Sequence, residues 1–318
     1  MSRTYFITGG AGNLACQLTF DLVERGHRVV LFDVADGPSG ASAEGCRYIR
    51  GDITSQEAVS AALHETRPQV VLHFSSLLSG RSELERSRAW GVNLDGAFAL
   101  FELALEQGVE QVFFPSSLAS YGGALPSPLP EDFPQWPSGL YGVTKASVER
   151  LGVYYHERHG LDFRCVRLPV VISAFAHSGA ASAYASRAFV EAAQFSRFTF
   201  KVRPETSPSV IYVKDVRRAI VGMLEAPSDG LTRRVYNIHA MAPSAKEISD
   251  AICLRLPEAE LVFDPDQEVV DLIESWPTKI DDTSARRDWG WKPHYDLESL
   301  TDDFVQELQR DPTYASGV

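Results

Sequence analysis

The stretch TYFITGGAGNLACQLTFDLVERGHRVVLFD, residues 4–33, predicts a strand, a glycine-rich turn, a helix and a second strand. Its two ends, TYFIT and HRVVLF, are short β-rich apolar runs. Between them Leu14, Leu18 and Leu22 recur every fourth residue, which places them on one face of a helix that Gly26 then stops. The stretch is therefore typical of a βαβ unit, from which parallel sheets are built.

The same alternation continues along the first half of the chain. Further strands are expected in CRYIR, QVVLHF, QVFFPS and FRCVRL, and further helices in TSQEAV, ERSRAWGVNLDGAFALFELALEQG and YGVTKASVERLGVYYHERHG. After about Leu168 the regularity weakens into a mixed second region without repeats. The pattern predicts an α/β protein with a parallel sheet in its N-terminal half.

Composition narrows the classes of function. The chain has 318 residues, 44% of them hydrophobic, and a formal net charge of -12 with no run of Lys or Arg, which argues against nucleic acid or an anionic membrane as a partner. No apolar stretch reaches the roughly 20 residues of a membrane span, and no secretory region precedes the first strand. Cys16, Cys46, Cys165 and Cys253 have no metal-like spacing, so we expect free thiols, no metal and a cytoplasmic protein.

The turn TGGAGNLA has the glycine pattern of a dinucleotide-binding loop. Gly9 permits the tight bend, Gly12 lets the backbone approach a pyrophosphate, and Ala15 permits close helix packing. Asn13 and Leu14 lie in the first helical turn, whose N-terminus would face the phosphates. Glycine-rich turns are common in α/β proteins, so the motif depends on its context.

That context is Asp33, at the end of the next strand. Its carboxylate lies about 20 residues beyond the turn, where dinucleotide-binding proteins hold the ribose hydroxyls. No basic residue follows in FDVADG to hold a 2′-phosphate, which favours NAD over NADP. The alternative is a solvated strand end.

Two later segments fit the same cofactor. In GDIT, Asp52 and Ile53 are positioned to receive an adenine, although a helix N-cap at Thr54 or Ser55 explains the segment equally well. In VLHFSSLLSG, the small residues after the fourth strand would let a cofactor pass closely, and a simple strand-to-loop turn is the alternative. The cofactor-binding residues expected in this second segment are Phe74, Ser75 and Ser76. His73 is interpreted as an interior histidine.

The segment YGVTK places Tyr141 and Lys145 four residues apart on one helix face. An ammonium there favours the tyrosinate and lowers a phenol pKa that starts near ~10, which makes tyrosine a usable base. Ser117, at the end of the fifth strand, is positioned to orient a substrate oxygen beside Tyr141. Ser116 is either the rival for this role or a second hydrogen bonder.

With these motifs the chain resembles the extended short-chain dehydrogenase/reductase family from TGGAG through GDIT, HFSS, NLDGAF, PSSLASYG and YGVTK to its C-terminus. The resemblance implies a Rossmann doubly wound parallel sheet that binds NAD in residues 1–168, with Leu168 among the cofactor contacts. It implies a smaller C-terminal α/β substrate region in residues 169–318, with some segments returning to the first domain. It also implies a homodimer formed through two long helices of each subunit.

The departures from the family bear on substrate. Its nucleotide-sugar epimerases usually carry an Asn after the sixth strand and an Arg in a RDYIHVxD-like segment, both used on a diphosphate. Here the stretches read RLPVVISA and PSVIYVKD: no Asn follows Arg167, and Pro208 or Ser209 stands where that arginine would be. A buried diphosphate needs such donors, so this chain is poorly equipped to hold one.

The C-terminal stretch SWPTKIDDTSARRDWGWKPHYDL, residues 275–297, instead resembles the L-threonine 3-dehydrogenases of the family, and LLSG with PSSLASYG resembles their substrate-side loops. This resemblance carries a substrate role to Ser79, Ser117, Tyr141 and Trp276, although Trp276 is equally well explained as a core aromatic.

One mismatch counts against that resemblance, because those enzymes tend to read GTTDY where this chain reads AASAY. Ser182 replaces one threonine hydroxyl, whereas Ala181 cannot replace the other. A dehydrogenase of a small hydroxy acid such as erythronate is therefore the rival interpretation.

The expected reaction is NAD-dependent oxidation of the β-hydroxyl of L-threonine to 2-amino-3-oxobutanoate. Tyr141 takes the proton, Lys145 lowers its pKa and holds the nicotinamide ribose, and Ser117 fixes the hydroxyl. The alternatives are nucleotide-sugar 4-epimerisation with tightly bound NAD and a non-catalytic NAD-sensing regulator. The presence of the Ser, Tyr and Lys argues against the regulator.

Overall fold

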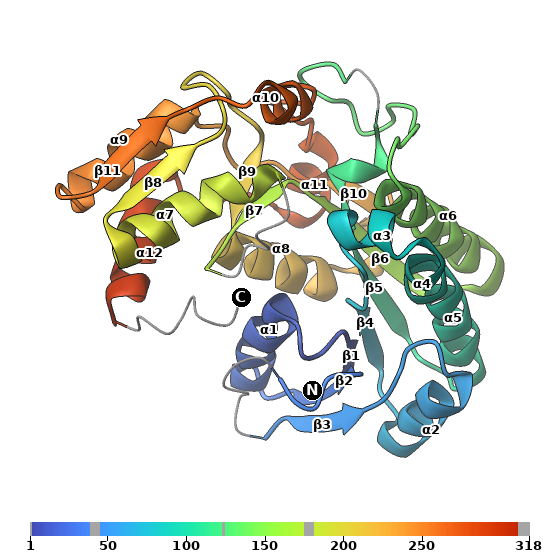
Figure 1. The fold of residues 1–318 in the computed structure, drawn as a ribbon. Coiled ribbons are helices and arrows are strands. Elements are labelled where there is room, and N and C mark those ends of the chain that lie inside the picture. The colour runs from blue at the N-terminus through green and yellow to red at the C-terminus, as the bar shows by residue number, and fades with distance from the viewer. Residues whose placement is uncertain (1, 39–44, 123–124, 175–180, 311–318) are drawn as a thin grey trace.

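The computed structural model describes residues 2–38, 45–122, 125–174 and 181–310. Its centre is a seven-stranded sheet in the order β10-β6-β5-β4-β1-β2-β3, with every neighbouring pair parallel (Figure 1). The strands are β1 (Thr4–Thr8), β2 (Arg28–Asp33), β3 (Arg47–Arg50), β4 (Val70–His73), β5 (Gln111–Ser117), β6 (Asp162–Leu168) and β10 (Val235–Asn237). The six strands expected before residue 169 are confirmed. The order reverses between β1 and β4, as in a doubly wound sheet.

Helices cover both faces of this sheet. Those of the N-terminal half are α1 (Asn13–Glu24), α2 (Gln56–Thr66), α3 (Ser79–Leu84), α4 (Arg86–Trp90), α5 (Gly96–Glu106) and α6 (Leu140–His159). Apolar residues of α2, α5 and α6 pack on one face, and residues of α1 pack on the other. The expected Rossmann-type architecture is therefore confirmed.

One expected helix differs from the sequence prediction. The long segment ERSRAWGVNLDGAFALFELALEQG is divided into α4 and α5 by a π-helical turn, η1 (Gly91–Asp95). A π turn inserts an extra residue into the helical repeat and changes which side chains face inward. Asn93 lies within this turn and faces the interior, where 4% of the residue is exposed.

The C-terminal half forms a smaller α/β region with two short parallel sheets, one of β7 with β9 and one of β8 with β11 (Figure 1). Its strands are β7 (Val170–Ile172), β8 (Arg197–Phe200), β9 (Val210–Tyr212) and β11 (Glu260–Phe263). Its helices are α7 (Tyr184–Phe195), α8 (Val213–Glu225), α9 (Ala245–Arg255), α10 (Gln267–Glu274), α11 (Thr283–Trp289) and α12 (Leu297–Arg310). The short 3-10 turns are η2 (Leu118–Ser120), η3 (Ala181–Ala183) and η4 (Ser228–Gly230).

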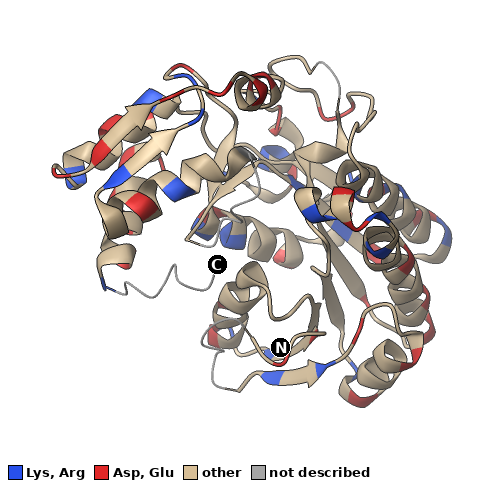
Figure 2. Ribbon diagram, viewed as in Figure 1, with Lys and Arg blue, Asp and Glu red and all other residues tan. Residues whose placement is uncertain are grey.

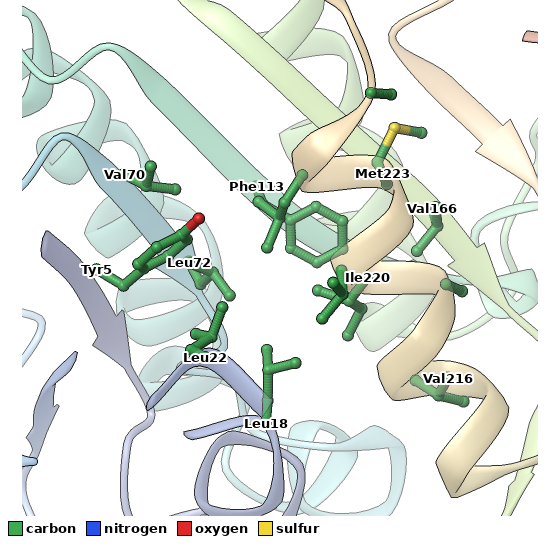
Figure 3. Close-up of a cluster of buried hydrophobic side chains, with 14 of the residues drawn as sticks. Tyr5, Leu18, Leu22, Val70, Leu72, Phe113, Val166, Val216, Ile220 and Met223 are labelled. Atoms are coloured by element: carbon green, nitrogen blue, oxygen red, sulfur yellow. The ribbon is translucent and has the colours of Figure 1, made fainter. Parts of the chain in front are cut away.

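Two elements from the C-terminal half complete the N-terminal sheet. Strand β10 pairs with β6 at the sheet edge, and α8 packs beside α1. Figure 3 shows Leu18 of α1 and Ile220 of α8 pointing into one apolar cluster with Phe113 of β5. The core of the dinucleotide-type fold thus draws on residues well beyond 168, and the division of the chain at that residue stays a prediction.

The surface carries charges of both signs. Figure 2 shows Lys and Arg interspersed with Asp and Glu along both halves of the ribbon. The four cysteines are thiols rather than halves of disulfides. Over the described ranges, no helix is long and apolar enough to cross a membrane, and no cluster of His, Cys, Asp and Glu is arranged to hold a metal ion.

Candidate active site

The glycine-rich turn lies where the strand order reverses, at the carboxyl ends of β1 and β4. Gly9 has a φ of +68°, and a Cβ built on it would lie 2.6 Å from the carbonyl carbon of Phe74 and 2.6 Å from the nitrogen of Ser75. Only glycine fits at this position, because both the dihedral angle and the approach of the β4 loop exclude a side chain. The turn and the loop after β4 therefore meet in backbone contact.

Helix α1 begins directly after this turn. Gly12 is its N-cap residue and offers no side-chain cap, and no acidic residue lies in the first turn. The first N–H groups of a helix have no partner within the helix and carry the positive end of its dipole. Asn13 and Leu14 thus lie at a terminus suited to phosphate oxygens.

Asp33 is fixed beside the turn. Its Oδ2 accepts a hydrogen bond from the Ala11 nitrogen at 3.1 Å, and its Oδ1 accepts one from the Ala35 nitrogen at 3.1 Å. Sequence reasoning missed the cation nearby: Arg50 pairs with Asp33 in the β2–β3 register, and its Nη1 lies 2.6 Å from Asp36. The two strands are separated in sequence, so the segment FDVADG alone gave no sign of it.

The hydrogen bonds of the segment after β3 show which of its residues is the helix N-cap. Asp52 Oδ1 accepts from the Thr54 nitrogen at 2.9 Å and from its hydroxyl at 2.8 Å. Ser55 is the N-cap residue of α2 and accepts from the Ala58 nitrogen at 3.2 Å. Ile53 is 6% exposed and packs into the core. The N-cap is therefore at Ser55, and an adenine role for Asp52 and Ile53 stays a prediction.

The loop after β4 is held by buried side chains. Thr8 shares a 2.8 Å hydrogen bond with Nδ1 of His73 and accepts one from the Ser75 nitrogen at 3.3 Å. His73 is fully buried, and burial lowers its pKa to about 3, so it stays neutral. Its interpretation as an interior histidine is confirmed. Phe74, Ser75 and Ser76 remain partly exposed on the adjoining loop.

Asn93 was missed by sequence reasoning. Its Oδ1 accepts from the Leu77 nitrogen at 2.7 Å, and its Nδ2 donates to the Leu77 oxygen at 3.0 Å and to Thr144 Oγ1 at 3.3 Å. It therefore ties the loop after β4 to the helix that carries Tyr141 and Lys145. The only signal was its place in NLDGAF.

Tyr141 lies in the first turn of α6, whose Leu140 nitrogen donates to Glu83 Oε1 at 2.7 Å. The Tyr141 phenol lies within the influence of the Ser117 hydroxyl, which lowers its pKa, and Ser117 Oγ accepts a hydrogen bond from the Ala119 nitrogen at 3.2 Å. Lys145 is 5% exposed, and its Nζ lies 5.4 Å from the centre of the Tyr141 ring. The three residues expected to be catalytic thus lie together at the carboxyl end of β5.

Burial dominates the proton affinities of this group. It raises the pKa of Tyr141 to about 12, although the nearby Ser117 hydroxyl opposes the rise. It lowers the pKa of Lys145 to about 8. The lowered phenol pKa expected from Lys145 is absent in this structure, because loss of hydration disfavours the tyrosinate more than its surroundings support it.

Ser116 is oriented differently from Ser117. It is 2% exposed, and its hydroxyl donates to Glu149 within the protein interior. Of the two serines, Ser117 is the one that acts on the pKa of Tyr141.

The remaining substrate candidates come from separate elements. Ser79 is exposed at the start of α3, Ser182 lies in η3, and Trp276 is partly buried and packs against the apolar core of the C-terminal region. Leu168, expected at the cofactor, ends β6. Residue 180 of the AASAY segment lies outside the described residues. Within the described parts of the chain, no direct bond joins the three substrate candidates to Tyr141.

Ser209, at one of the positions compared with the epimerases, and Arg167, which precedes the other, both make internal contacts. Ser209 is buried and shares a 2.9 Å hydrogen bond with Nδ1 of His239. Arg167 is 4% exposed and donates to Glu149 through Nε and Nη2. The Arg167 guanidinium is thus committed to Glu149, and Ser209 carries no positive charge for a diphosphate.

The sequence of the chain is similar to that of known NAD-dependent enzymes. The model of the NAD dependent epimerase/dehydratase family matches residues 5–238. The mitochondrial L-threonine 3-dehydrogenase of Bos taurus is 35% identical over 298 residues, which cover 92% of this chain and 79% of that protein.

Solved structures agree with this relationship. The L-threonine dehydrogenase of Clostridium difficile superposes with a TM-score of 0.91 at 31% identity, over 97% of this chain and 98% of that one. A UDP-glucose 4-epimerase of Thermotoga maritima shares the fold, with a TM-score of 0.83 at 22% identity over 96% of this chain and 99% of that one. The chain belongs to the NAD dependent epimerase/dehydratase family and is an oxidoreductase of that family.

Proposed function

We propose that this enzyme oxidises the β-hydroxyl of L-threonine to 2-amino-3-oxobutanoate, with NAD as hydride acceptor. The observation that carries the proposal is the meeting of Ser117, Tyr141 and Lys145 at the carboxyl end of β5, where the Ser117 hydroxyl acts on the pKa of the phenol and Lys145 Nζ lies 5.4 Å from the ring centre. The choice of L-threonine as substrate rests on the relatives that are named as L-threonine dehydrogenases.

The residues present fit NAD. The close approach at Gly9, the uncapped N-terminus of α1 and the fixed carboxylate of Asp33 suit a pyrophosphate and a ribose in turn. We assign the adenine to Asp52 and Ile53, and the nicotinamide half to Phe74, Ser75, Ser76, Tyr141, Lys145 and Leu168. NAD, when bound, supplies the hydride acceptor.

The protein's own part is to hold the substrate hydroxyl and remove its proton. Ser117 accepts or donates a hydrogen bond to the hydroxyl and keeps it beside the Tyr141 oxygen. Tyr141 takes the proton as hydride leaves the β-carbon. Lys145 favours the tyrosinate as long as it remains an ammonium and holds the nicotinamide ribose. Because Ser116 donates to Glu149, we propose no substrate contact for it.

The substrate is proposed to be small. A diphosphate brings about two charges that need donors when buried, and the side chains at Arg167 and Ser209 are committed to internal partners. Ser79, Ser182 and Trp276 are the proposed substrate contacts of the C-terminal side. Ala181 favours the alternative within the same reaction class, a small hydroxy acid such as erythronate.

The active form is proposed to be a homodimer. Trp90, Phe98 and Tyr154 are 43%, 49% and 49% exposed, and they come from α4, α5 and α6. Phe98 and Tyr154 line one surface hollow with Leu94 and Leu151. Exposed apolar groups gathered on adjacent helices are typical of a contact surface, and light scattering would give the mass in solution.

The compartment remains a proposal as well. Four cysteines present as thiols support a reducing environment such as the cytoplasm, whereas the bovine relative is named as mitochondrial.

The decisive experiment offers purified protein and NAD a panel of L-threonine, erythronate and UDP-galactose. NADH absorbance with L-threonine is expected, and Tyr141→Phe should abolish most of it. NADH formation with erythronate alone would support a dehydrogenase whose substrate is a small hydroxy acid instead of L-threonine. Conversion of UDP-galactose to UDP-glucose would refute the proposed class of reaction.

A further inference from the structure

A buried ion pair lies directly behind the proposed catalytic residues. Glu149 is 1% exposed and Arg167 is 4% exposed. Arg167 Nη2 lies 2.8 Å from Glu149 Oε2, and its Nε lies 3.0 Å from Oε1. A buried charge pair is costly to desolvate, and well-packed apolar residues often serve as well for stability. Its presence beside the site therefore calls for an explanation other than stability.

The pair joins the elements that carry the catalytic residues. Glu149 follows Lys145 by one helical turn on α6, and Arg167 lies opposite Ser116 in the β5–β6 register. Lys145 donates to the Pro115 oxygen at 2.8 Å, and Ser116 donates to Glu149. Two consecutive residues of β5 are thus bound by two consecutive turns of one face of α6. The next residue of β5 is Ser117.

The charges around Lys145 single out Glu149. Burial lowers the pKa of Lys145, and Cys165 and Glu149 oppose the change. Burial holds the pKa of the Cys165 thiol well above its usual value, so that thiol is neutral at physiological pH. His73 and Tyr141 are also neutral there. Among the described residues, Glu149 is the negative charge that remains to support the ammonium.

We propose that Glu149 is a positioning residue for Lys145: it neutralises Arg167 and keeps the Lys145 side chain charged and bonded to β5. Without the carboxylate, the Arg167 guanidinium would be an uncompensated cation in the same interior and would oppose the ammonium. Gln135 holds the second oxygen of Glu149, with Nε2 donating to Oε2 at 2.8 Å. The inference rests on the proposed function, because it gives Lys145 a catalytic role.

The test measures the protonation of Lys145 directly. The chain contains six lysines, so 13C-labelled lysine gives few NMR signals, and Lys145→Met assigns the one of interest. Glu149→Gln should lower the titration midpoint of Lys145 by about one pH unit, whereas Arg167→Gln, which removes the opposite charge, should raise it. Glu157→Gln on the exposed part of α6 is the matched control and should leave the midpoint unchanged.

The pH dependence of turnover provides the second readout. In Glu149→Gln, the pH at which turnover stops rising should fall with the Lys145 midpoint. Equal midpoints in folded Glu149→Gln and Glu157→Gln, or shifts of the same sign in Glu149→Gln and Arg167→Gln, would show a purely structural role and overturn the inference. If only Glu149→Gln folds, a midpoint equal to that of Glu157→Gln overturns the inference. If only Arg167→Gln folds, a midpoint that is not raised overturns it. Absence of NADH from the wild type would refute the proposed function and leave the NMR titration readable.

Discussion

Replacing Gly9 with alanine tests the turn on which the proposed NAD site depends. The added Cβ would lie 2.6 Å from two backbone atoms of the β4 loop, and the residue would keep a φ of +68°. The left-handed conformation costs a residue with a Cβ roughly 1–2 kcal/mol. Forcing an extra methyl group into a packed interior costs roughly 1–3 kcal/mol more. We therefore expect the free energy of unfolding to fall by about 2–5 kcal/mol.

The chain supplies a matched control in Gly26. Its φ is +78°, and a Cβ built there meets nothing within 4 Å. Gly26→Ala should therefore cost only the conformational part, roughly 1–2 kcal/mol. Denaturant unfolding followed by circular dichroism measures both losses, and quenching of tryptophan fluorescence measures NAD affinity.

The two variants are expected to differ in free energy of unfolding and in NAD affinity. Gly9→Ala should lose about 1–3 kcal/mol more than Gly26→Ala and should bind NAD more weakly, because the loop after β4 must move away. Gly26→Ala should bind NAD normally. Equal losses of stability and unchanged NAD affinity in both variants would refute the claim that the turn and the loop require glycine at this contact.

Three further expectations concern the chemistry. Asp33→Ala should weaken NAD more than NADP, because it removes a ribose acceptor and a charge that repels a 2′-phosphate while Arg50 remains; equal affinities for the two cofactors in the unmodified protein would contradict this. Tyr141→Phe should retain NAD binding and lose turnover by roughly 10²-fold or more, and near-normal NADH production would place the base elsewhere. Turnover should rise with pH and level off near pH 8. The tyrosinate fraction of Tyr141 grows with pH below its pKa of about 12, whereas Lys145 loses its proton through a pKa of about 8, and the two changes cancel above that pH. A rise that continues well beyond pH 9 would argue against a requirement for the ammonium.

Local patterns were sufficient for α1 and for the strands of the N-terminal half. The spacing of Leu14, Leu18 and Leu22 and the β-rich runs predicted α1 and the six strands, because apolar periodicity reports directly on which face is buried. The order of Ser117, Tyr141 and Lys145 along the chain likewise predicted a group that the structure brings together.

Features that depend on pairing between distant segments were not predictable. Arg50 meets the surroundings of Asp33 only through the β2–β3 register. Asn93 bonds to the loop after β4 and to Thr144 of α6, and both partners are distant from it in sequence. Glu149 and Arg167 read as ordinary charged residues until α6 lies on β6. Apolar periodicity carries no record of such partners, which explains why these side chains were missed.

The position of β10 and α8 has a consequence for synthesis of the chain. When residue 168 leaves the ribosome, six strands of the main sheet exist, but β6 has an unpaired edge and part of one face lacks its covering helix. The nascent chain must shield this edge and the apolar side chains around Phe113 until residue 237 has been made. The last strand of the sheet is therefore added late in translation. A fragment that ends at residue 168 is expected to aggregate rather than fold alone.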